Sequence, residues 1–170
     1  MSEKFAIFGN PVAHSKSPQM QNAGLNHINF DGNYEKHHLE NGNEIKKAFL
    51  ESNYKGANIT VPHKEFAYEN ADEVRGLAKE IKAVNTYILE DGKVIAYNTD
   101  APGFLKAIES FGTIKNVLLL GAGGTAKAIA LALKSKDINV TVLNRSEGKL
   151  EFFKEHQIPC FSWGNFEPTK

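Results

Sequence analysis

The sequence predicts an α/β protein whose sheets are mostly parallel. Short runs of strand-forming residues alternate with segments of helical periodicity, which is typical of parallel-rich α/β folds. In the last third of the chain, a glycine cluster lies between a strand run and a helical segment, as in a βαβ unit. The dipeptide Asp91-Gly92 separates two neighbouring strand runs and predicts one antiparallel hairpin.

The predicted strands are short apolar runs bounded by turn-forming residues. The runs lie at Phe5–Phe8, Tyr34–Leu39, Gly56–Val61, Val84–Leu89, Val94–Tyr97, Asn116–Leu120, Asn139–Leu143 and, most weakly, Ile158–Phe161.

The predicted helices place their apolar residues on one face. They lie at Pro18–His27, Glu44–Ser52, Ala71–Ile81, Pro102–Phe111 and Thr125–Lys134. In the third helix, Val74, Leu77, Ala78 and Ile81 follow the i, i+3, i+4, i+7 spacing. Ser17-Pro18 predicts an N-cap followed by proline at the first helical position. The irregular strand spacing ends before the βαβ unit, so we expect two domains, at residues 1–101 and 102–170.

Composition limits the classes of partner. The chain has 170 residues, 41% hydrophobic and 24% charged, and its 20 basic and 20 acidic side chains cancel. A neutral chain gives no electrostatic reason to bind nucleic acid or a membrane surface. Cys160 is the single cysteine, which excludes an intrachain disulfide and fits a reducing compartment. Since we also see no signal peptide and no run of membrane-spanning length, we expect a cytoplasmic protein.

The glycine cluster predicts a phosphate cradle. Residues Gly121, Ala122, Gly123, Gly124 and Thr125 follow a strand run and open a helix. Glycines permit a tight turn there and let backbone N–H groups approach a pyrophosphate at the helix N-terminus. A bare tight turn would also use glycine, but the strand–helix–strand context favours a Rossmann-type dinucleotide site.

The second strand of this unit indicates which dinucleotide. An NAD site usually has an acidic residue about 20 residues after the glycines. Here the strand ends in Asn144, Arg145 and Ser146. Because the planar guanidinium binds phosphate oxygens bidentately, Arg145 favours NADP with its 2′-phosphate. The alternative is that Arg145 is a solvated loop residue and that Ser146 caps the next helix.

Polar residues gather where strands of the first part begin or end. They are Ser15, Ser17, Thr60, Lys64, Asn85 and Asp100. In open α/β sheets ligands bind on such loops. A lysine and an aspartate among hydroxyl and amide groups suit a polyol whose carbonyl is reduced, since that reaction needs a proton donor. Taken singly, the same residues could be turn caps and surface charges.

The six histidines give little evidence for a metal. His37 and His38 are adjacent on a predicted strand and so point to opposite faces, and no Cys/His spacing resembles a zinc site. We therefore expect no metal site. His14 and His63 lie in the polar loops, where they could line a cleft.

Taken together, these motifs resemble those of the shikimate dehydrogenase family. The matching pieces occur in the family's order and span nearly the whole chain. They are Gly9-Asn10-Pro11-Val12, His14-Ser15-Lys16-Ser17-Pro18, Asn58-Ile59-Thr60-Val61-Pro62 with Lys64, Ala83-Val84-Asn85-Thr86, Asn98-Thr99-Asp100 with Gly103, Gly121-Ala122-Gly123-Gly124 and Asn144-Arg145-Ser146.

The resemblance implies an NADPH-dependent, reversible reduction of 3-dehydroshikimate to shikimate, on the route to chorismate and the aromatic amino acids. It assigns the substrate carboxylate to Ser15 and Ser17. It assigns the ring hydroxyls to Thr60, Asn85 and Asp100, and acid–base chemistry to Lys64 paired with Asp100. It places the pyrophosphate at Gly121 to Thr125, and the 2′-phosphate at Asn144, Arg145 and Ser146.

The chain departs from the family pattern in two ways. His63 and Lys82 stand where the family often has an aromatic residue and a glycine. Family members also continue beyond the position of Lys170, so we expect an incomplete cofactor domain and exposed apolar surface at Leu118, Leu120 and Val142. Two other functions stay open, a non-catalytic shikimate-binding module and a quinate/shikimate dehydrogenase. Either a monomer or a homodimer would fit.

Overall fold

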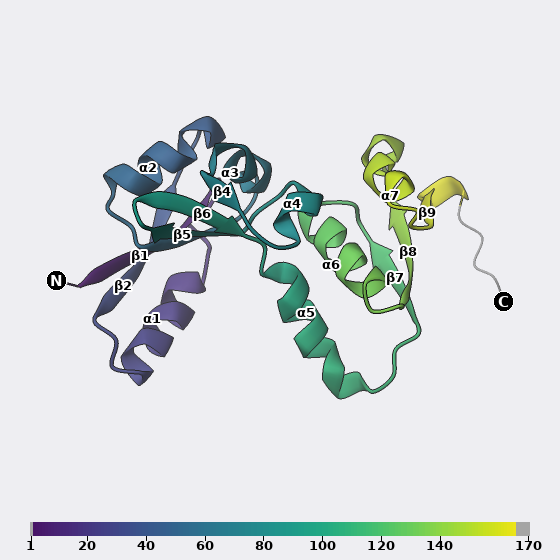
Figure 1. Ribbon diagram of the computed structural model, residues 1–170, viewed down its shortest axis with the longest axis horizontal. Coiled ribbons are helices and arrows are strands. Elements are labelled where there is room, and N and C mark those ends of the chain that lie inside the picture. The colour runs from purple at the N-terminus through teal and green to yellow at the C-terminus, as the bar shows by residue number, and fades with distance from the viewer. Residues whose placement is uncertain (1, 166–170) are drawn as a thin grey trace. The chain divides into compact units, whose positions relative to one another are not determined.

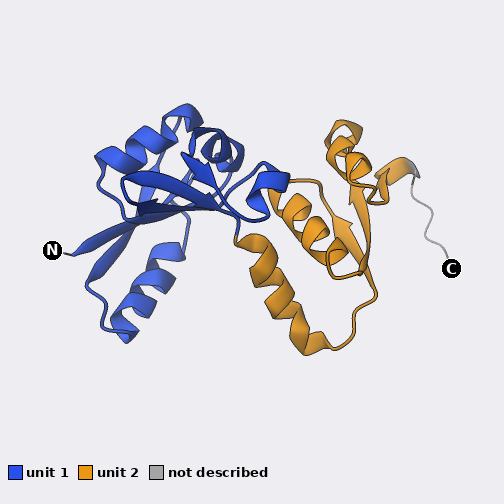
Figure 2. Ribbon diagram, in the orientation of Figure 1, with its two compact units in different colours: residues 1–98 blue, residues 99–170 orange. Residues whose placement is uncertain are grey.

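The structure, a computed structural model, describes residues 2–165. The chain divides into two compact units, residues 1–98 and 99–170, which Figure 2 shows in different colours. Each unit has its own sheet. The predicted roles of the two parts, with substrate binding in residues 1–101 and dinucleotide binding in residues 102–170, stay a prediction.

The first unit is built on a six-stranded sheet in the order β2-β1-β3-β5-β6-β4. The strands are β1 (Glu3–Gly9), β2 (Gly32–His38), β3 (Gly56–Ile59), β4 (Glu73–Val74), β5 (Thr86–Glu90) and β6 (Lys93–Tyr97). β1 runs parallel to β2 and β3, and β4 runs parallel to β6. Only the pairs around β5 are antiparallel, with β6 following through the predicted Asp91-Gly92 turn. The mostly parallel α/β fold is confirmed.

Helices lie on both faces of this sheet (Figure 1). They are α1 (Ser17–His27), α2 (Ile45–Glu51) preceded by the 3-10 turn η1 (Gly42–Glu44), α3 (Lys64–Asn70) and the short α4 (Ala78–Ile81). Because side chains alternate along a strand, Ala6 and Phe8 pack in one core with Phe49 of α2, whereas Ile7 packs on the α1 side with Tyr34. The α1 side is the thinner layer, since α1 buries none of its residues fully.

The predicted helix Ala71–Ile81 is wrong. Residues Glu73–Val74 form the edge strand β4, and helix begins only at Ala78. Between them Gly76 has φ +62°, a left-handed conformation that interrupts a right-handed helix. The apolar spacing is still satisfied, because Val74 packs against the core from a strand and Ile81 is buried from the short helix.

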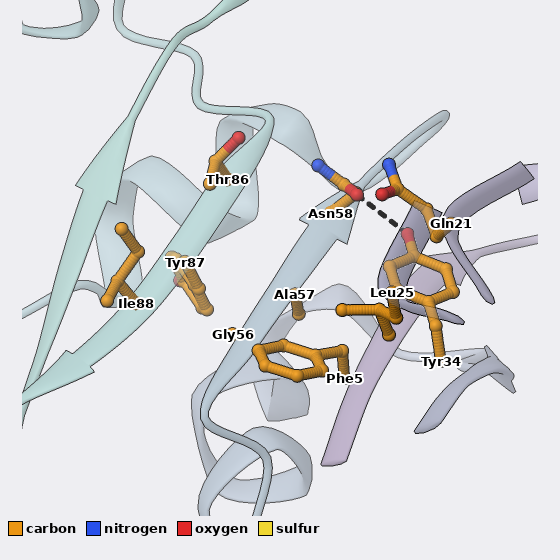
Figure 3. A pocket seen from close by; sticks show the side chains of 10 residues that line it. All are labelled: Phe5, Gln21, Leu25, Tyr34, Gly56, Ala57, Asn58, Thr86, Tyr87 and Ile88. Carbon is orange, nitrogen blue, oxygen red and sulfur yellow. Dashed lines mark hydrogen bonds between the residues drawn. The ribbon is translucent and has the colours of Figure 1, made fainter. Parts of the chain in front are cut away.

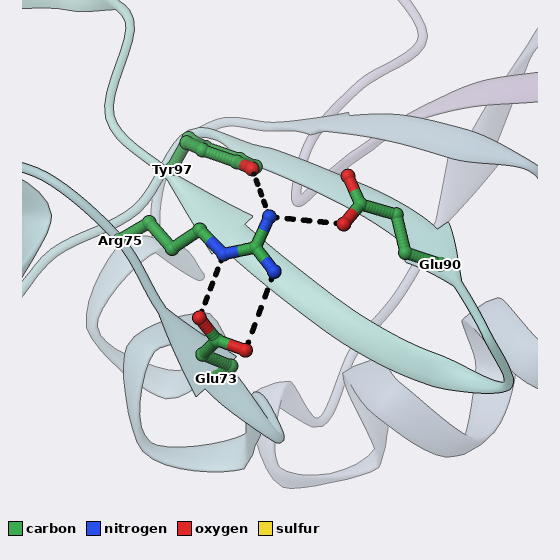
Figure 4. A network of polar contacts seen from close by, with 4 residues as sticks. All are labelled: Glu73, Arg75, Glu90 and Tyr97. Atoms are coloured by element: carbon green, nitrogen blue, oxygen red, sulfur yellow. Dashed lines mark hydrogen bonds and ion pairs between the residues drawn. The ribbon is translucent and has the colours of Figure 1, made fainter.

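A polar network holds β4 in place. Arg75 contacts three side chains: its Nε lies 2.7 Å from Glu73 Oε1, and its Nη1 lies 2.9 Å from Glu90 Oε2 and 2.8 Å from the Tyr97 hydroxyl (Figure 4). Backbone pairing of Glu73 with Ile95 places the strand beside β6. Tertiary contacts therefore override the helical propensity of this segment.

The start of α1 also differs from the expectation. The N-cap residue is Lys16, and Ser17 is the first helical residue. The Ser17 N–H donates to Ser15 Oγ at 3.2 Å, so Ser15 supplies a side-chain acceptor for the first N–H of the helix.

The second unit contains a parallel three-stranded sheet in the order β7-β8-β9. Its strands are β7 (Asn116–Leu120), β8 (Asn139–Asn144) and β9 (Cys160–Ser162). Its helices are α5 (Asp100–Ile108), α6 (Gly124–Lys134) and α7 (Glu151–Glu155), with the 3-10 turns η2 (Glu109–Phe111), η3 (Glu147–Lys149) and η4 (Trp163–Asn165). This arrangement is a partial Rossmann-type βαβ fold, as predicted.

The expected apolar exposure holds at β7 but not at β8. Leu118 is 48% exposed and Leu120 66%, whereas Val142 is fully buried. The difference follows from the register: Val142 pairs with Leu119, so it points to the opposite face of the sheet from Leu118 and Leu120. Among the helices of residues 2–165, none is long and apolar enough to cross a membrane.

Candidate functional site

One edge of the first unit's sheet collects most of the predicted substrate residues. β1 and β3 are parallel and end at this edge, and the antiparallel β5 begins there, opposite the end of β6. Backbone hydrogen bonds join the ends: Thr60 N donates to Phe8 O at 2.9 Å, and Asn85 N donates to Tyr97 O at 3.0 Å. The loops that leave this edge carry the predicted Ser15, Ser17, Thr60, Lys64 and Asn85.

Ser15 and Ser17 lie together where the β1–α1 loop enters α1. The Ser15 hydroxyl donates to Ser17 Oγ at 3.2 Å, and both side chains are half-buried. The turn interpretation is therefore correct for the backbone, because Ser15 Oγ also accepts the Ser17 N–H. The pair also presents two hydroxyls at the first turn of an 11-residue helix, where the helix dipole favours an anion.

Thr60, Lys64 and Asn85 are fixed by the backbone around them. Thr60 is half-buried against Gly9, where an added Cβ would lie 2.6 Å from Thr60 Cγ2, so the close approach requires glycine. Lys64 opens α3, and its carbonyl accepts the Val84 N–H at 3.0 Å. Asn85 is 8% exposed, and its Oδ1 accepts the Thr86 hydroxyl at 2.9 Å.

His63 does not line a cleft, contrary to expectation. Its side chain is 1% exposed and its Nε2 lies 2.7 Å from the Leu39 carbonyl oxygen. Since a carbonyl only accepts, Nε2 carries the proton there. Within residues 2–165 the buried Nδ1 has no hydrogen-bond partner. His14, in contrast, is exposed in the β1–α1 loop.

A pocket of about 240 Å³ adjoins this edge on the α1 side of the sheet. Its polar rim comes from Gln21, Asn58 and Thr86, and its apolar wall includes Phe5 and Leu25 (Figure 3). Asn58, which was not among the predicted substrate residues, thus lines a pocket beside them. The signal was present in the sequence, because Asn58 lies two residues before Thr60 and so on the same face of the strand.

Tyr34 fixes the amide of Asn58. The Tyr34 hydroxyl donates to Asn58 Oδ1 at 2.7 Å, as the dashed line in Figure 3 shows. Burial raises the pKa of Tyr34 far above its ordinary value, so the hydroxyl keeps its proton. The Asn22 side chain in turn holds the Tyr34 backbone through two hydrogen bonds of 2.8 Å. With Oδ1 occupied, the NH₂ of Asn58 is directed to the other side of the pocket rim.

In the second unit, the glycine loop fits a pyrophosphate. Gly121 has φ +117°, which L side chains rarely adopt, and its N–H donates to Leu143 O at 2.7 Å. An added Cβ at Gly121 or Gly123 would meet no heavy atom within 4 Å, so the surface above the loop is open. The first intrahelical bond of α6 runs from Lys127 N to Gly123 O. The N–H groups of Gly124, Thr125 and Ala126 thus lie in the first turn, where anions bind.

The residues after β8 lie at the same edge as this loop, because β7 and β8 are parallel. Asn144 Nδ2 donates to Ser146 O at 2.8 Å and closes a tight turn. Arg145 and Ser146 are exposed. Ser146 is the N-cap residue of η3, but its side chain forms no capping hydrogen bond.

Asp100 opens α5 and therefore belongs to the second unit, whereas Lys64 belongs to the first. The Thr125 hydroxyl donates to Asp100 Oδ2 at 3.1 Å. The predicted pairing of Lys64 with Asp100 stays a prediction. No cluster of histidine, cysteine and acidic residues in the described part of the chain could hold a metal ion.

Comparison with known proteins shows which family this chain resembles. Residues 7–87 match the model of the shikimate dehydrogenase substrate binding domain. The shikimate dehydrogenase (NADP(+)) of Helicobacter hepaticus is 44% identical over 166 residues, which is 97% of this chain and 62% of that protein. Over nearly its whole length the chain is similar to NADP(+)-dependent shikimate dehydrogenases.

Solved structures extend the family likeness across both units. The shikimate dehydrogenase of Aquifex aeolicus superposes with a TM-score of 0.86 at 36% identity, over 94% of this chain and 62% of that one. The shikimate 5-dehydrogenase of Thermus thermophilus, in complex with NADP(H) and shikimate, gives a TM-score of 0.85 with the same identity and coverage. The chain thus spans about 62% of the length of these family members.

Proposed function

We propose that the chain carries the substrate-binding unit and part of the dinucleotide-binding unit of a shikimate dehydrogenase, which reduces 3-dehydroshikimate to shikimate with NADPH. The observation that carries the proposal is the shared sheet edge, from which five of the six predicted substrate residues leave. The relative solved with NADP(H) and shikimate supports the same ligands here. In this role the protein serves the route to chorismate and the aromatic amino acids.

The polar groups at the edge match the polar groups of the substrate. The Ser15 and Ser17 hydroxyls, beside the start of α1, hold the carboxylate. Thr60, Asn85 and Asp100 hold ring hydroxyls. Asn58 is a further candidate, because Tyr34 fixes its amide at the pocket rim.

Lys64 is the proposed acid–base residue. NADPH, when bound, supplies the hydride that reaches the carbonyl carbon of the substrate. The Lys64 ammonium donates a proton to the carbonyl oxygen, so that the ketone becomes an alcohol, and the reverse direction returns the proton to the amine. Asp100 orients the ammonium and accepts a hydrogen bond from a neighbouring hydroxyl. A fixed proton donor beside the developing oxyanion stabilises the transition state.

The second unit is proposed to hold NADP. The backbone from Gly121 to Thr125 cradles the pyrophosphate, as its open glycine turn and helix start support. The exposed Arg145, with Asn144 and Ser146, holds the 2′-phosphate. Phosphate binding by an exposed guanidinium needs no rearrangement of the fold.

The test uses the intact protein that carries this sequence. NADPH absorbance is followed with 3-dehydroshikimate, in the parent and in Lys64→Ala. General acid–base assistance typically contributes about 10²–10⁴-fold, so Lys64→Ala should lower kcat by about that factor while shikimate still binds. A Lys64→Ala protein with full kcat would remove Lys64 from the chemistry. A parent that binds shikimate without oxidising NADPH would be a binding module, and one that also oxidises quinate would have the broader activity.

Location and assembly belong to the same proposal. The single cysteine supports a cytoplasmic enzyme. Either a monomer or a homodimer is compatible with a site built from one chain, and the molar mass in solution decides between them.

A further inference from the structure

Two helices of the second unit begin at residues with different proposed roles. α5 begins at Asp100, a proposed substrate and acid–base residue, and α6 begins at Gly124 in the proposed pyrophosphate loop. The two helices pack side by side within the unit (Figure 1). One hydrogen bond joins their first turns, from the Thr125 hydroxyl to Asp100 Oδ2 at 3.1 Å.

This bond is not a capping contact within one helix. Its partners are 25 residues apart in the chain. The N-cap residues are Thr99 for α5 and Gly123 for α6, and neither forms a side-chain capping bond. An ionised carboxylate only accepts, so the Thr125 proton is directed at Asp100 and restrains the plane of its carboxylate.

Thr125 is also part of the loop that meets the dinucleotide. Its N–H is one of the first-turn donors of α6, and its side chain is exposed. An anion held at these N–H groups fixes the backbone of Thr125. The hydroxyl of the same residue then holds Asp100, which links order in the loop to the orientation of the carboxylate.

We propose that Thr125 is a positioning residue that couples dinucleotide binding to the orientation of Asp100. The inference rests on the proposed function and adds to it a link between the two binding events. Coupling between two sites is reciprocal, so NADP⁺ should tighten the binding of shikimate, and shikimate should tighten the binding of NADP⁺ by the same factor.

The test measures shikimate affinity by calorimetry with and without saturating NADP⁺, in the intact protein that carries this sequence. In the parent, saturating NADP⁺ should lower the dissociation constant of shikimate by about fivefold or more, which is the lower end of typical coupling. Thr125→Val keeps the shape but removes the donor, and it should bring this factor to within about twofold of unity. Thr125→Ser retains the hydroxyl and should keep the parental coupling. Thr113→Val, an exposed threonine of the same unit, is the matched control and should also keep it.

Steady-state kinetics give a second readout. Thr125→Val should lower kcat by about tenfold, the loss of roughly one hydrogen bond to a charged group, with little change in the KM for NADPH measured at low 3-dehydroshikimate, where the coupling does not act. In an Asp100→Ala background the same substitution should change neither quantity further, because the acceptor is gone. Thr125→Ala is a second variant without the donor, in case valine disturbs the first turn of α6.

The outcomes separate this inference from the proposed function. A parent that binds neither shikimate nor NADP⁺ defeats the proposed function, and this inference with it. An active parent without coupling, a Thr125→Val protein with parental coupling and kcat, or equal losses in the Asp100→Ala background would each overturn the role of Thr125 alone.

Discussion

At the residue scale, Ser15 and Ser17 combine a structural and a proposed binding role. Their hydroxyls contact each other, and Ser15 also accepts the Ser17 N–H. If they hold the substrate carboxylate, they do so equally in the ground state and the transition state. Ser15→Ala and Ser17→Ala should therefore raise KM for shikimate more than they lower kcat, as steady-state kinetics will show. Unchanged KM values in both variants would show that the serines stabilise the turn and do not bind the substrate.

Arg145 decides between the two dinucleotides. Its exposed guanidinium follows β8, at the edge that carries the glycine loop. A hydrogen bond to a charged group contributes about 1.5–3 kcal/mol. Arg145→Ala should therefore weaken the affinity for NADP⁺ by about tenfold or more and leave the affinity for NAD⁺ nearly unchanged. Calorimetric titration with each dinucleotide measures the two affinities. Equal affinities of the parent for NADP⁺ and NAD⁺ would contradict the assignment.

Tyr34 has a role that only the structure reveals. Its buried hydroxyl is the donor to Asn58, and its loss would leave an amide oxygen at the pocket rim without that donor. Tyr34→Phe should therefore lower the free energy of unfolding by about 1–3 kcal/mol, measured by urea denaturation. Tyr68→Phe, at a half-buried tyrosine of α3, is the matched control. A loss no larger than that of the control would show that the hydrogen bond does not stabilise the unit.

At the element scale, the β7–α6 turn depends on one glycine. Gly121 has φ +117°, a region that costs a residue with a Cβ on the order of 1–3 kcal/mol. Gly121→Ala should destabilise the second unit by about that amount, as thermal unfolding would show. It should also weaken the affinity for NADPH, as fluorescence titration would show. Gly103→Ala in α5 is the control with the opposite sign, since it replaces a helical glycine in open space and should stabilise by about 0.5–1 kcal/mol. A Gly121→Ala protein as stable as the parent would contradict the strain argument.

The sequence predicted the elements that carry strong local signals. The hairpin at Asp91-Gly92 and the strand–glycine–helix unit at Gly121 both follow from turn chemistry. The helix at Ala71–Ile81 failed because its apolar spacing fits a strand, a turn and a short helix equally well. Gly76 was the local signal against a continuous helix, but the pairing of β4 with β6 is a long-range contact that no window of sequence contains.

At the scale of the whole molecule, motif order indicated which segments meet at one edge of the sheet better than any single residue did. Ser15, Thr60 and Asn85 are far apart in the chain, and strand pairing brings their segments to one edge. Burial was the part that could not be predicted. His63 was expected in a cleft and lies in the core, where its Nε2–H donates to the Leu39 carbonyl, a contact that only the packed structure reveals.

The shared sheet edge has a thermodynamic consequence. Because its polar groups come from segments spread over the first 98 residues, no partly folded form of the first unit contains the complete set. A ligand of this edge therefore binds the native state and not the unfolded chain, and mass action shifts the unfolding equilibrium. Shikimate at about 100 times its dissociation constant should stabilise the first unit by about 2.7 kcal/mol. In differential scanning calorimetry the melting transition of that unit should rise with the logarithm of shikimate concentration, and a transition that stays constant would show that the ligand does not select the folded edge.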